Sequence, residues 1–143
     1  MKILKRNLGF LLLCLNCSAY GQINCSKDIL VGHWRQVKSI PGVHTNVDSL
    51  KYLIRKSGKT IGTLEFQADG IYKYTFLEFT DKKDHKYFVD TLICEIILGT
   101  KKNARIKSNL KIIYLDEQFL IFTEDNNPKG DETYLMTKFE VTE

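Results

Sequence analysis

The side chains that could bind a metal or perform catalysis are dispersed along the chain. The three histidines, His33, His44 and His85, lie in different predicted elements. None has a second histidine two or four residues away, the spacing that places two metal ligands on one face of a strand or helix. The pattern therefore predicts no metal site and no bound cofactor.

Nucleophiles and general acids also lack recognisable partners. The chain contains no Gly-x-Ser-x-Gly motif, no phosphate-binding glycine loop and no dinucleotide-binding motif. Ser39 and Ser108 have no histidine partner in the sequence pattern, although folding can bring one close. Glu65, Glu78 and Glu95 lie on predicted strands and could pair as acid and base inside a barrel, but carboxylates on strands more often face solvent. The sequence therefore favours a binding protein over an enzyme.

Aromatic side chains on predicted strands are the candidates for a binding surface. Tyr72, Tyr74 and Phe76 share one face of a strand, because they alternate with polar residues. Such residues can line an apolar pocket in which tyrosine hydroxyls orient a guest, or they can fill the interior and leave no cavity. The full candidate set is Phe66, Tyr72, Tyr74, Phe76, Tyr114, Phe119 and Tyr134.

Residues 1–21 have the layout of a secretory signal peptide. Basic residues precede an apolar run over residues 8–15, and Ala19 and Gly21 supply the small side chains that a signal peptidase recognises. We expect cleavage after Gly21. The apolar run is too short for a transmembrane anchor, which needs about 20 residues, and no later segment is long and uncharged. The mature protein, residues 22–143, is therefore expected to be exported, periplasmic or secreted, and not transmembrane.

The four cysteines divide between the leader and the mature chain. Removal of Cys14 and Cys17 with the leader leaves Cys25 and Cys94. In an oxidising compartment such a pair indicates a disulfide, which would close a loop of 69 residues and restrict the unfolded chain by about 4 kcal/mol. The alternative is two separate small hydrophobic residues. A lipid anchor on Cys14, Cys17 or Cys25 is a further alternative, but none follows the small residue that a bacterial lipoprotein signal has there.

The basic charge of the chain belongs largely to the leader. The full chain has 21 basic and 17 acidic residues. Lys2, Lys5 and Arg6 leave with the leader, so the mature chain carries 18 basic and 17 acidic residues. The densest basic stretches, "KSGK" at 56–59 and "GTKKNARIK" at 99–107, are typical of solvated turns. This balance predicts no nucleic-acid partner and no binding to an anionic membrane.

Alternating apolar and polar residues predict strands along most of the mature chain. Asp69-Gly70 and Asp116-Glu117 each lie between two such runs and predict tight hairpins. Together with both arms of the first hairpin, eight strands are predicted in a mostly sequential order. They are residues 33–40, 63–67, 72–76, 87–98, 104–109, 110–115, 118–124 and 132–141.

Residues 46–59 depart from the strand pattern. Apolar residues recur there at helical spacing, with Asp48 as the predicted N-cap and Gly58 as the stop. Pro41-Gly42 ends the preceding strand. We expect a short helix or an irregular flap in this region.

Eight short antiparallel strands in one domain must protect their edges. We predict an all-β fold, a single antiparallel eight-stranded up-and-down barrel with one short helix or flap after the first strand. An interior of this size is either filled by side chains or holds one small ligand. The alternative is an open sandwich, but its Greek-key connections need longer crossings than most of the turns in this chain allow.

The stretches "LVGHWRQV", "LEFQADGIYKY" and "YLDEQFLIFTEDN…ETYLMTKFE" resemble the small lipocalin-like (calycin-type) domains of secreted bacterial proteins, over about Asp28 to Glu140. The resemblance implies that Trp34 plugs the closed end of the barrel beneath a basic side chain from the last strand. Lys138 is the best match to that side chain, although the family more often has arginine. Without the resemblance, Trp34 is still expected to be a buried anchor, and Gly32 permits a close approach or an unusual φ.

The leading hypothesis is an exported, lipocalin-like protein that binds a small apolar or amphipathic ligand at the open end, under the flap near residues 44–58. The alternative is a periplasmic interaction module or inhibitor that uses the loops "DKKDHK" at 81–86 and "EDNNPKGDE" at 124–132. An enzyme is the third hypothesis. We expect a monomer or weak dimer.

Overall fold

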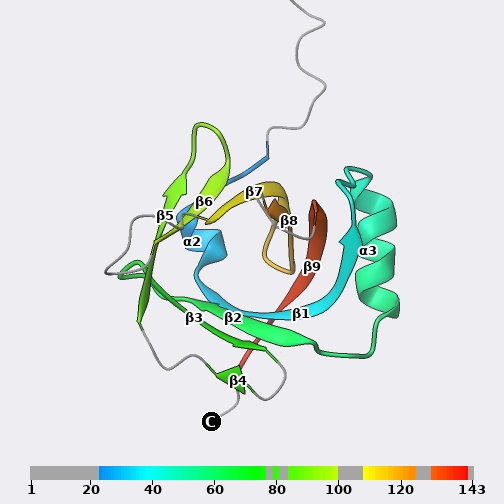
Figure 1. The fold of residues 1–143 in the computed structure, drawn as a ribbon, viewed down its shortest axis with the longest axis horizontal. Coiled ribbons are helices and arrows are strands. Elements are labelled where there is room, and N and C mark those ends of the chain that lie inside the picture. Colours follow the sequence, from blue (N-terminus) through cyan, green and yellow to red (C-terminus); the bar gives the residue numbers. More distant parts are fainter. Residues whose placement is uncertain (1–22, 77–78, 81–83, 100–107, 125–129, 142–143) are drawn as a thin grey trace, which may run out of the picture.

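Eight antiparallel strands close into an up-and-down barrel, in agreement with the predicted fold class (Figure 1). The computed structural model describes residues 23–76, 79–80, 84–99, 108–124 and 130–141. Each barrel strand pairs with the next one along the chain, and the last strand pairs with the first. The barrel strands are β1 (Gly32–Pro41), β2 (Gly62–Phe66), β3 (Ile71–Phe76), β5 (His85–Asp90), β6 (Glu95–Gly99), β7 (Ser108–Leu115), β8 (Phe119–Glu124) and β9 (Glu132–Phe139). A two-residue strand, β4 (Phe79–Thr80), pairs with β3 beside the barrel.

The predicted single strand over residues 87–98 is wrong, because this run contains a hairpin. β5 and β6 are separated by a turn over residues 91–94. Asp90 stabilises the turn, since its Oδ1 accepts the backbone N–H groups of Leu92 and Ile93 at 3.0 and 3.4 Å. The turn carries apolar residues instead of glycine or proline, so its composition does not predict a turn.

The two strands predicted over residues 104–109 and 110–115 form one strand where the structure describes them. β7 begins at Ser108, which pairs with Leu98 of β6, and continues to Leu115. Residues 104–107 lie outside the described part of the chain. The two boundary errors compensate each other, so the predicted count of eight barrel strands is confirmed.

Both predicted hairpins are confirmed, and an aspartate supports each turn. Gly70 has a φ of 85°, a conformation that favours glycine. Asp69 Oδ1 accepts a hydrogen bond from the backbone N–H of Ile71 at 3.1 Å. Asp116 Oδ1 accepts the backbone N–H groups of Gln118 and Phe119 at 2.8 and 2.7 Å. These local hydrogen bonds explain why the sequence predicts both turns.

Apolar side chains form two cores, one on each face of the sheet. The inner core lies inside the barrel and includes Trp34, Phe66, Ile96, Leu120 and Met136. The outer core lies between the barrel wall and a helix, and it consists of Val37, Leu50, Ile54, Phe119, Ile121 and Leu135. Since strand residues alternate between faces, β8 contributes to both cores and is buried at five consecutive positions.

The helix over the outer core, α3 (Val47–Lys56), is present as predicted, but it is not a flap over the open end. It lies outside the ring of strands, where Leu50 and Ile54 are buried against the wall (Figure 1). Its N-cap is Asn46, whose Oδ1 accepts the Ser49 N–H at 3.1 Å, so the predicted cap at Asp48 is wrong. Because its one apolar stripe packs on the barrel wall, α3 does not cover the interior.

A second, four-residue helix, α2 (Lys27–Leu30), precedes β1 and lies within the outline of the barrel (Figure 1). The predicted disulfide joins Cys25, just before α2, to Cys94 in the turn between β5 and β6, with their Cα atoms 5.5 Å apart. It closes a loop of 69 residues. The disulfide therefore attaches α2 to the turn at one end of the barrel.

Candidate ligand cavity of the barrel

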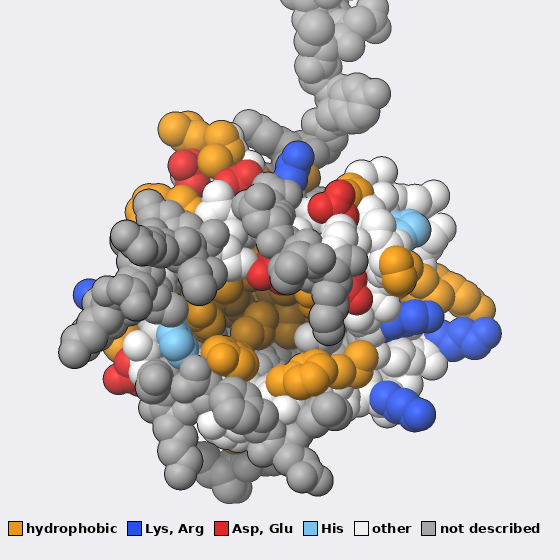
Figure 2. Space-filling view, viewed as in Figure 1, with side chains coloured by type: hydrophobic (Ala, Val, Ile, Leu, Met, Phe, Trp, Pro, Cys, Tyr) orange, Lys and Arg blue, Asp and Glu red, His pale blue; other side chains and the backbone are white. Residues whose placement is uncertain are grey.

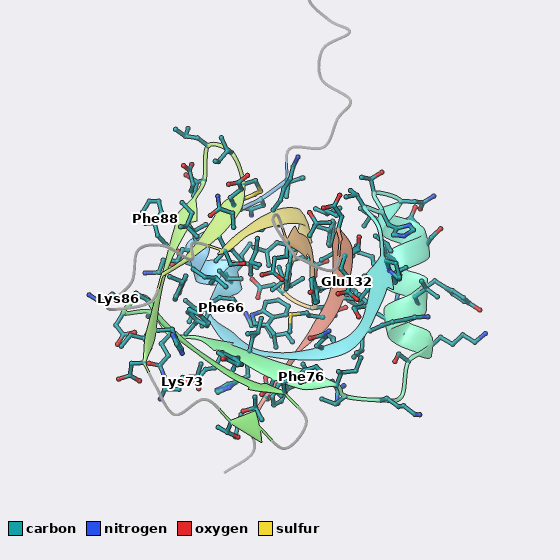
Figure 3. All side chains as sticks on the ribbon, viewed as in Figure 1. Phe66, Lys73, Phe76, Lys86, Phe88 and Glu132 are labelled. Atoms are coloured by element: carbon teal, nitrogen blue, oxygen red, sulfur yellow. A yellow bond between two sulfur atoms is a disulfide. The ribbon has the colours of Figure 1, made fainter. Side chains whose placement is uncertain are left out.

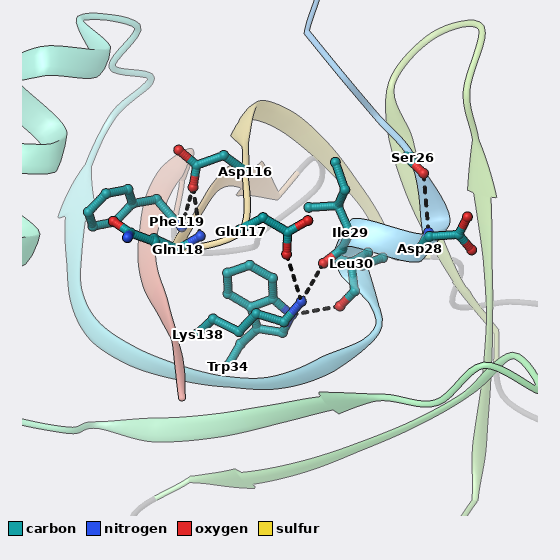
Figure 4. A network of polar contacts seen from close by, with 10 residues as sticks. All are labelled: Ser26, Asp28, Ile29, Leu30, Trp34, Asp116, Glu117, Gln118, Phe119 and Lys138. Carbon is teal, nitrogen blue, oxygen red and sulfur yellow. Dashed lines mark hydrogen bonds and ion pairs between the residues drawn. The ribbon is translucent and has the colours of Figure 1, made fainter. Parts of the chain in front are cut away.

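Trp34 closes the end of the barrel that adjoins α2. Its side chain is fully buried, and its Nε1 donates a hydrogen bond to the Leu30 carbonyl at 2.7 Å (Figure 4). Lys138 is its register partner on β9, with Nζ 5.1 Å from the centre of the indole ring, within the range of a cation–π contact. The same Nζ donates to the Ile29 carbonyl at 2.8 Å and lies 3.9 Å from Glu117. The resemblance implies a contact between Trp34 and a basic side chain of the last strand. That contact is present.

Gly32 makes room for that contact. Its φ of 130° lies in the region that favours glycine. A Cβ atom at this position would lie 2.8 Å from Lys138 Cε. Both observations agree with the predicted close approach at this residue.

A cavity of about 360 Å³ occupies the barrel interior toward the opposite, open end. Figure 2 looks into this hollow, which has hydrophobic walls and acidic side chains near its edge. The described residues thus leave a hollow inside the barrel. The cavity is lined by Gln36, Thr63, Leu64, Tyr72, Tyr74, Thr75, Phe76, Leu98, Ser108, Leu110, Phe122, Glu124, Tyr134 and Met136.

Two polar side chains of the cavity contact the carboxylate of Glu124, the last residue of β8. Ser108, at the start of β7, donates a hydrogen bond to Glu124 Oε1. The hydroxyl of Tyr134 lies 3.3 Å from Glu124 Oε2 and 3.1 Å from Glu132 Oε2. Figure 3 shows Glu132 beside β9 and Phe66 within the ring of strands, whereas Lys86 and Phe88 point away from the ring.

The pKa of Tyr134 is strongly raised above the ordinary value of a tyrosine. Burial of the hydroxyl is the largest cause, followed by the negative charges of Glu124 and Glu132 and the hydrogen bonds to them. Tyr134 therefore keeps its proton at physiological pH and acts as a hydrogen-bond donor. It is suited to orient a guest and not to act as a base.

The structure brings together four of the seven aromatic candidates for ligand binding. Tyr72, Tyr74, Phe76 and Tyr134 line the cavity. Phe66 also faces the interior, but it packs in the inner core, 1% exposed, and is not a lining residue.

Tyr114 and Phe119 lie on the outer face of the barrel, contrary to the expectation that they line the pocket. Phe119 belongs to the outer core, and Tyr114 packs against it. Lys51 of α3 lies 3.7 Å from the centre of the Tyr114 ring. A bulge in β7 between Ile112 and Tyr114 shifts the register there, so simple alternation does not predict the face.

Sequence reasoning missed the main polar group of the cavity. The sequence pattern places Glu124 at the end of a predicted strand and in a loop, and Ser108 in a predicted strand as a nucleophile without a histidine partner, but it assigns neither to the cavity. Alternation along β8 could have identified Glu124, because it follows Leu120 and Phe122 on the same face of the strand. Gln36 shares the inner face of β1 with Trp34 and could have been found in the same way.

The candidate metal-binding histidines lie apart. The His33 ring packs against Phe139, and His44 Nε2 lies 2.8 Å from the Pro41 carbonyl. The His85 ring lies 5.2 Å from the ring of Tyr72. Across the described residues, no group of three or more histidine, cysteine or acidic side chains could hold a metal.

The two described candidates for acid–base chemistry, Glu65 and Glu95, each bind the amide of a neighbouring side chain. Glu65 Oε1 accepts a hydrogen bond from Gln67 at 2.7 Å, and Glu95 accepts one from Asn109 at 3.4 Å. Glu78 lies outside the described residues. Ser39 lies on β1 opposite Tyr134 of β9, and Ser108 donates a hydrogen bond to Glu124 and not to a histidine.

Several predictions concern segments that the structure does not describe. They are the signal peptide over residues 1–21 with Cys14 and Cys17, residues 81–83 and 125–129 of the two loops proposed as an interaction surface, and most of the basic stretch at 99–107. In the part of the chain that is described, neither helix is long and apolar enough to cross a bilayer. Searches against protein-family models, curated proteins and solved structures found no match for this chain.

Proposed function

We propose that the protein is an exported, lipocalin-like barrel that binds one small apolar or amphipathic molecule in the cavity at its open end. The cavity carries this proposal, because about 360 Å³ of space lies inside a barrel whose other end is sealed by Trp34. Pockets for small molecules are typically apolar, with a few convergent polar groups and volumes of about 300–1,000 Å³. The aromatic walls and the Glu124 group fit that description.

The disulfide supports the export part of the proposal, since disulfides persist in oxidising compartments. Native mass spectrometry of the protein purified from its own host tests this part. Export predicts a chain that begins at Gln22 and has a mass two protons below that of the reduced form. A retained leader, or a lipid on Cys25, would contradict the predicted processing.

A binding titration tests the cavity directly. A small fluorophore that is neutral at pH 7, 1-aminonaphthalene, is expected to bind the wild-type protein with enhanced emission. Leu98→Trp places an indole ring in the cavity wall and is expected to weaken binding at least tenfold. The matched control is Phe88→Trp on the neighbouring strand, where the side chain is 63% exposed and outside the cavity. Circular dichroism then checks that both variants remain folded.

The comparison between the two tryptophan variants decides the outcome. Weakened binding in Leu98→Trp alone supports a ligand site inside the barrel. Equal binding by both variants, or no binding by the wild type to any apolar probe, would show that the cavity is not a ligand site.

A further inference from the structure

The charge of the cavity indicates which class of ligand it favours. Among the described lining residues, Glu124 is the only one with a formal charge. Glu132, the first residue of β9, contributes a second carboxylate beside it, on the other side of the Tyr134 hydroxyl. Among the described residues, the two charged groups that meet at the Tyr134 hydroxyl are therefore both carboxylates.

The two carboxylates compete for one proton. The Tyr134 hydroxyl lies within hydrogen-bonding distance of both Glu124 and Glu132, but it has a single proton to donate. Ser108 supplies a second proton, to the other oxygen of Glu124. A carboxylate can accept about four hydrogen bonds, so this group retains acceptor capacity for a guest that brings its own donors.

The described ion pairs lie elsewhere in the barrel. They join Lys51 to Asp116 and Lys138 to Glu117, so none of their cations neutralises the carboxylates at the open end. The pKa of Tyr134 is raised by burial and by these same carboxylates, which oppose a negative charge on its oxygen. The same two carboxylates would repel an anionic head group at this position.

The cavity walls also suit a cation. The Tyr72 and Tyr74 rings are stacked with centroids 6.5 Å apart, and the Phe122 and Tyr134 rings are stacked at 5.1 Å. Aromatic faces attract ammonium groups, and the attraction increases where water is excluded. The cavity thus combines an apolar interior, aromatic faces and an anionic polar group.

From this combination we propose that the natural ligand is a cationic amphiphile, an apolar chain or ring with a protonated amine, whose ammonium group is held by Glu124 and Glu132. The inference rests on the proposed function and specifies its ligand class. The volume accommodates a guest of roughly a dozen non-hydrogen atoms, at about 30 Å³ each, the share of one water molecule in the liquid. A fatty acid of the same length is disfavoured, because its carboxylate would approach two others.

Three ligands of equal chain length and different head-group charge test the proposal. Decylammonium, decanol and decanoate are each titrated at pH 7 by displacement of 1-aminonaphthalene. We expect decylammonium to bind at least tenfold more tightly than decanol, and decanoate to bind most weakly. Glu124→Gln, which preserves shape and removes charge, should reduce the preference for decylammonium over decanol at least fivefold.

One further variant serves as a control, and another replaces Glu124→Gln if that protein does not fold. Glu65→Gln removes a carboxylate from β2 that does not line the cavity, and it should leave the preference unaltered. If Glu124→Gln does not fold, Glu132→Gln at the rim replaces it and should lower the preference in the same direction.

The outcomes separate the two proposals. If none of the three ligands displaces the fluorophore and the fluorophore itself does not bind, the proposed function fails. If decanol or decanoate binds as tightly as decylammonium, or if the preference survives in both Glu124→Gln and Glu132→Gln, the cavity binds ligands but the proposed cationic class is wrong.

Discussion

Charged side chains lie beside aromatic rings at both ends of the barrel, but the partners of those charges differ. At the closed end, the Lys138 ammonium has the Ile29 carbonyl, the Trp34 ring and Glu117 as partners within the protein. At the open end, Glu124 and Glu132 share the hydroxyl of Tyr134. Lys138 is held by partners within the protein and stabilises the closed end, whereas Glu124 lines the cavity and Glu132 lies beside it, where a bound ligand would meet them. Changes at the closed end should therefore alter stability, and changes at the open end should alter binding.

Truncation of the plug is expected to have the largest effect on stability. Trp34→Ala removes a fully buried indole and its hydrogen bond to Leu30, and should lower the free energy of unfolding by about 3–5 kcal/mol. The matched open-end variant, Phe76→Ala, truncates a side chain that is 48% exposed and should cost less than half as much while weakening ligand binding. Urea denaturation measures both. If the milder Trp34→Phe abolished binding without changing the melting temperature, the structural role of Trp34 would be wrong.

Loss of the disulfide should come next. The double variant Cys25→Ser, Cys94→Ser should lower the free energy of unfolding by about 2–4 kcal/mol, because it releases a 69-residue loop. Fluorophore affinity at the open end should be unchanged in the folded variant. Denaturation with and without a reductant provides the comparison. A wild-type protein equally stable under both conditions would show that the bond contributes nothing.

A single methyl group at Gly32 tests the packing of the plug. Gly32→Ala should cost about 1–3 kcal/mol, because its φ of 130° is strained for alanine and the new Cβ would crowd Lys138. Gly58→Ala is the control, since no atom lies within 4 Å of a Cβ at that position. Differential scanning calorimetry should show a lower melting temperature for Gly32→Ala alone. Equal losses in the two variants would argue against a specific contact.

The smallest expected effect concerns pH. The pKa of Asp116, in the turn between β7 and β8, is below its ordinary value. Desolvation acts to raise it, but hydrogen bonds from Tyr114, Gln118 and Phe119 and the charge of Lys51 outweigh that effect. A depressed pKa stabilises the fold above the ordinary value, and this contribution is lost as the pH falls through the folded-state pKa.

Asp116→Asn should therefore reduce stability at pH 7 by no more than about 1 kcal/mol, as expected for an ion pair that solvent partly reaches. It should also weaken the fall in stability below about pH 4, the ordinary value for aspartate. Thermal denaturation from pH 2 to 7 measures both slopes. Parallel curves for wild type and variant would rule out a contribution from this carboxylate, and unchanged fluorophore binding at pH 7 would locate the effect at the closed end.

Local signals in the sequence predicted the parts of this fold that depend on neighbouring residues. Asp69-Gly70 and Asp116-Glu117 marked their hairpins because aspartate side chains bind the turn backbone. The turn after Asp90 escaped notice, since it carries Leu92 and Ile93, which are 95% and 57% exposed, where polar turn residues are expected. The N-cap of α3 was misplaced by two residues for a similar reason, because Asn46 and Asp48 are both good caps and only the helix start distinguishes them.

By itself, the sequence predicted the eight-strand barrel from its periodicity, a buried Trp34 from the size of its side chain, and the pairing of Cys25 with Cys94 from the even cysteine count of the mature chain. The contact between Trp34 and Lys138 was implied by the resemblance alone. Only the tertiary structure decided what lies inside. Both faces of β8 are buried, so alternation of polarity could not assign Phe119 to the outside, and Glu124 became a cavity residue through contacts with Ser108 and Tyr134 from other strands. Which surfaces of a closed sheet meet depends on the pairing of distant strands and on where α3 packs, and no short stretch of sequence contains that information.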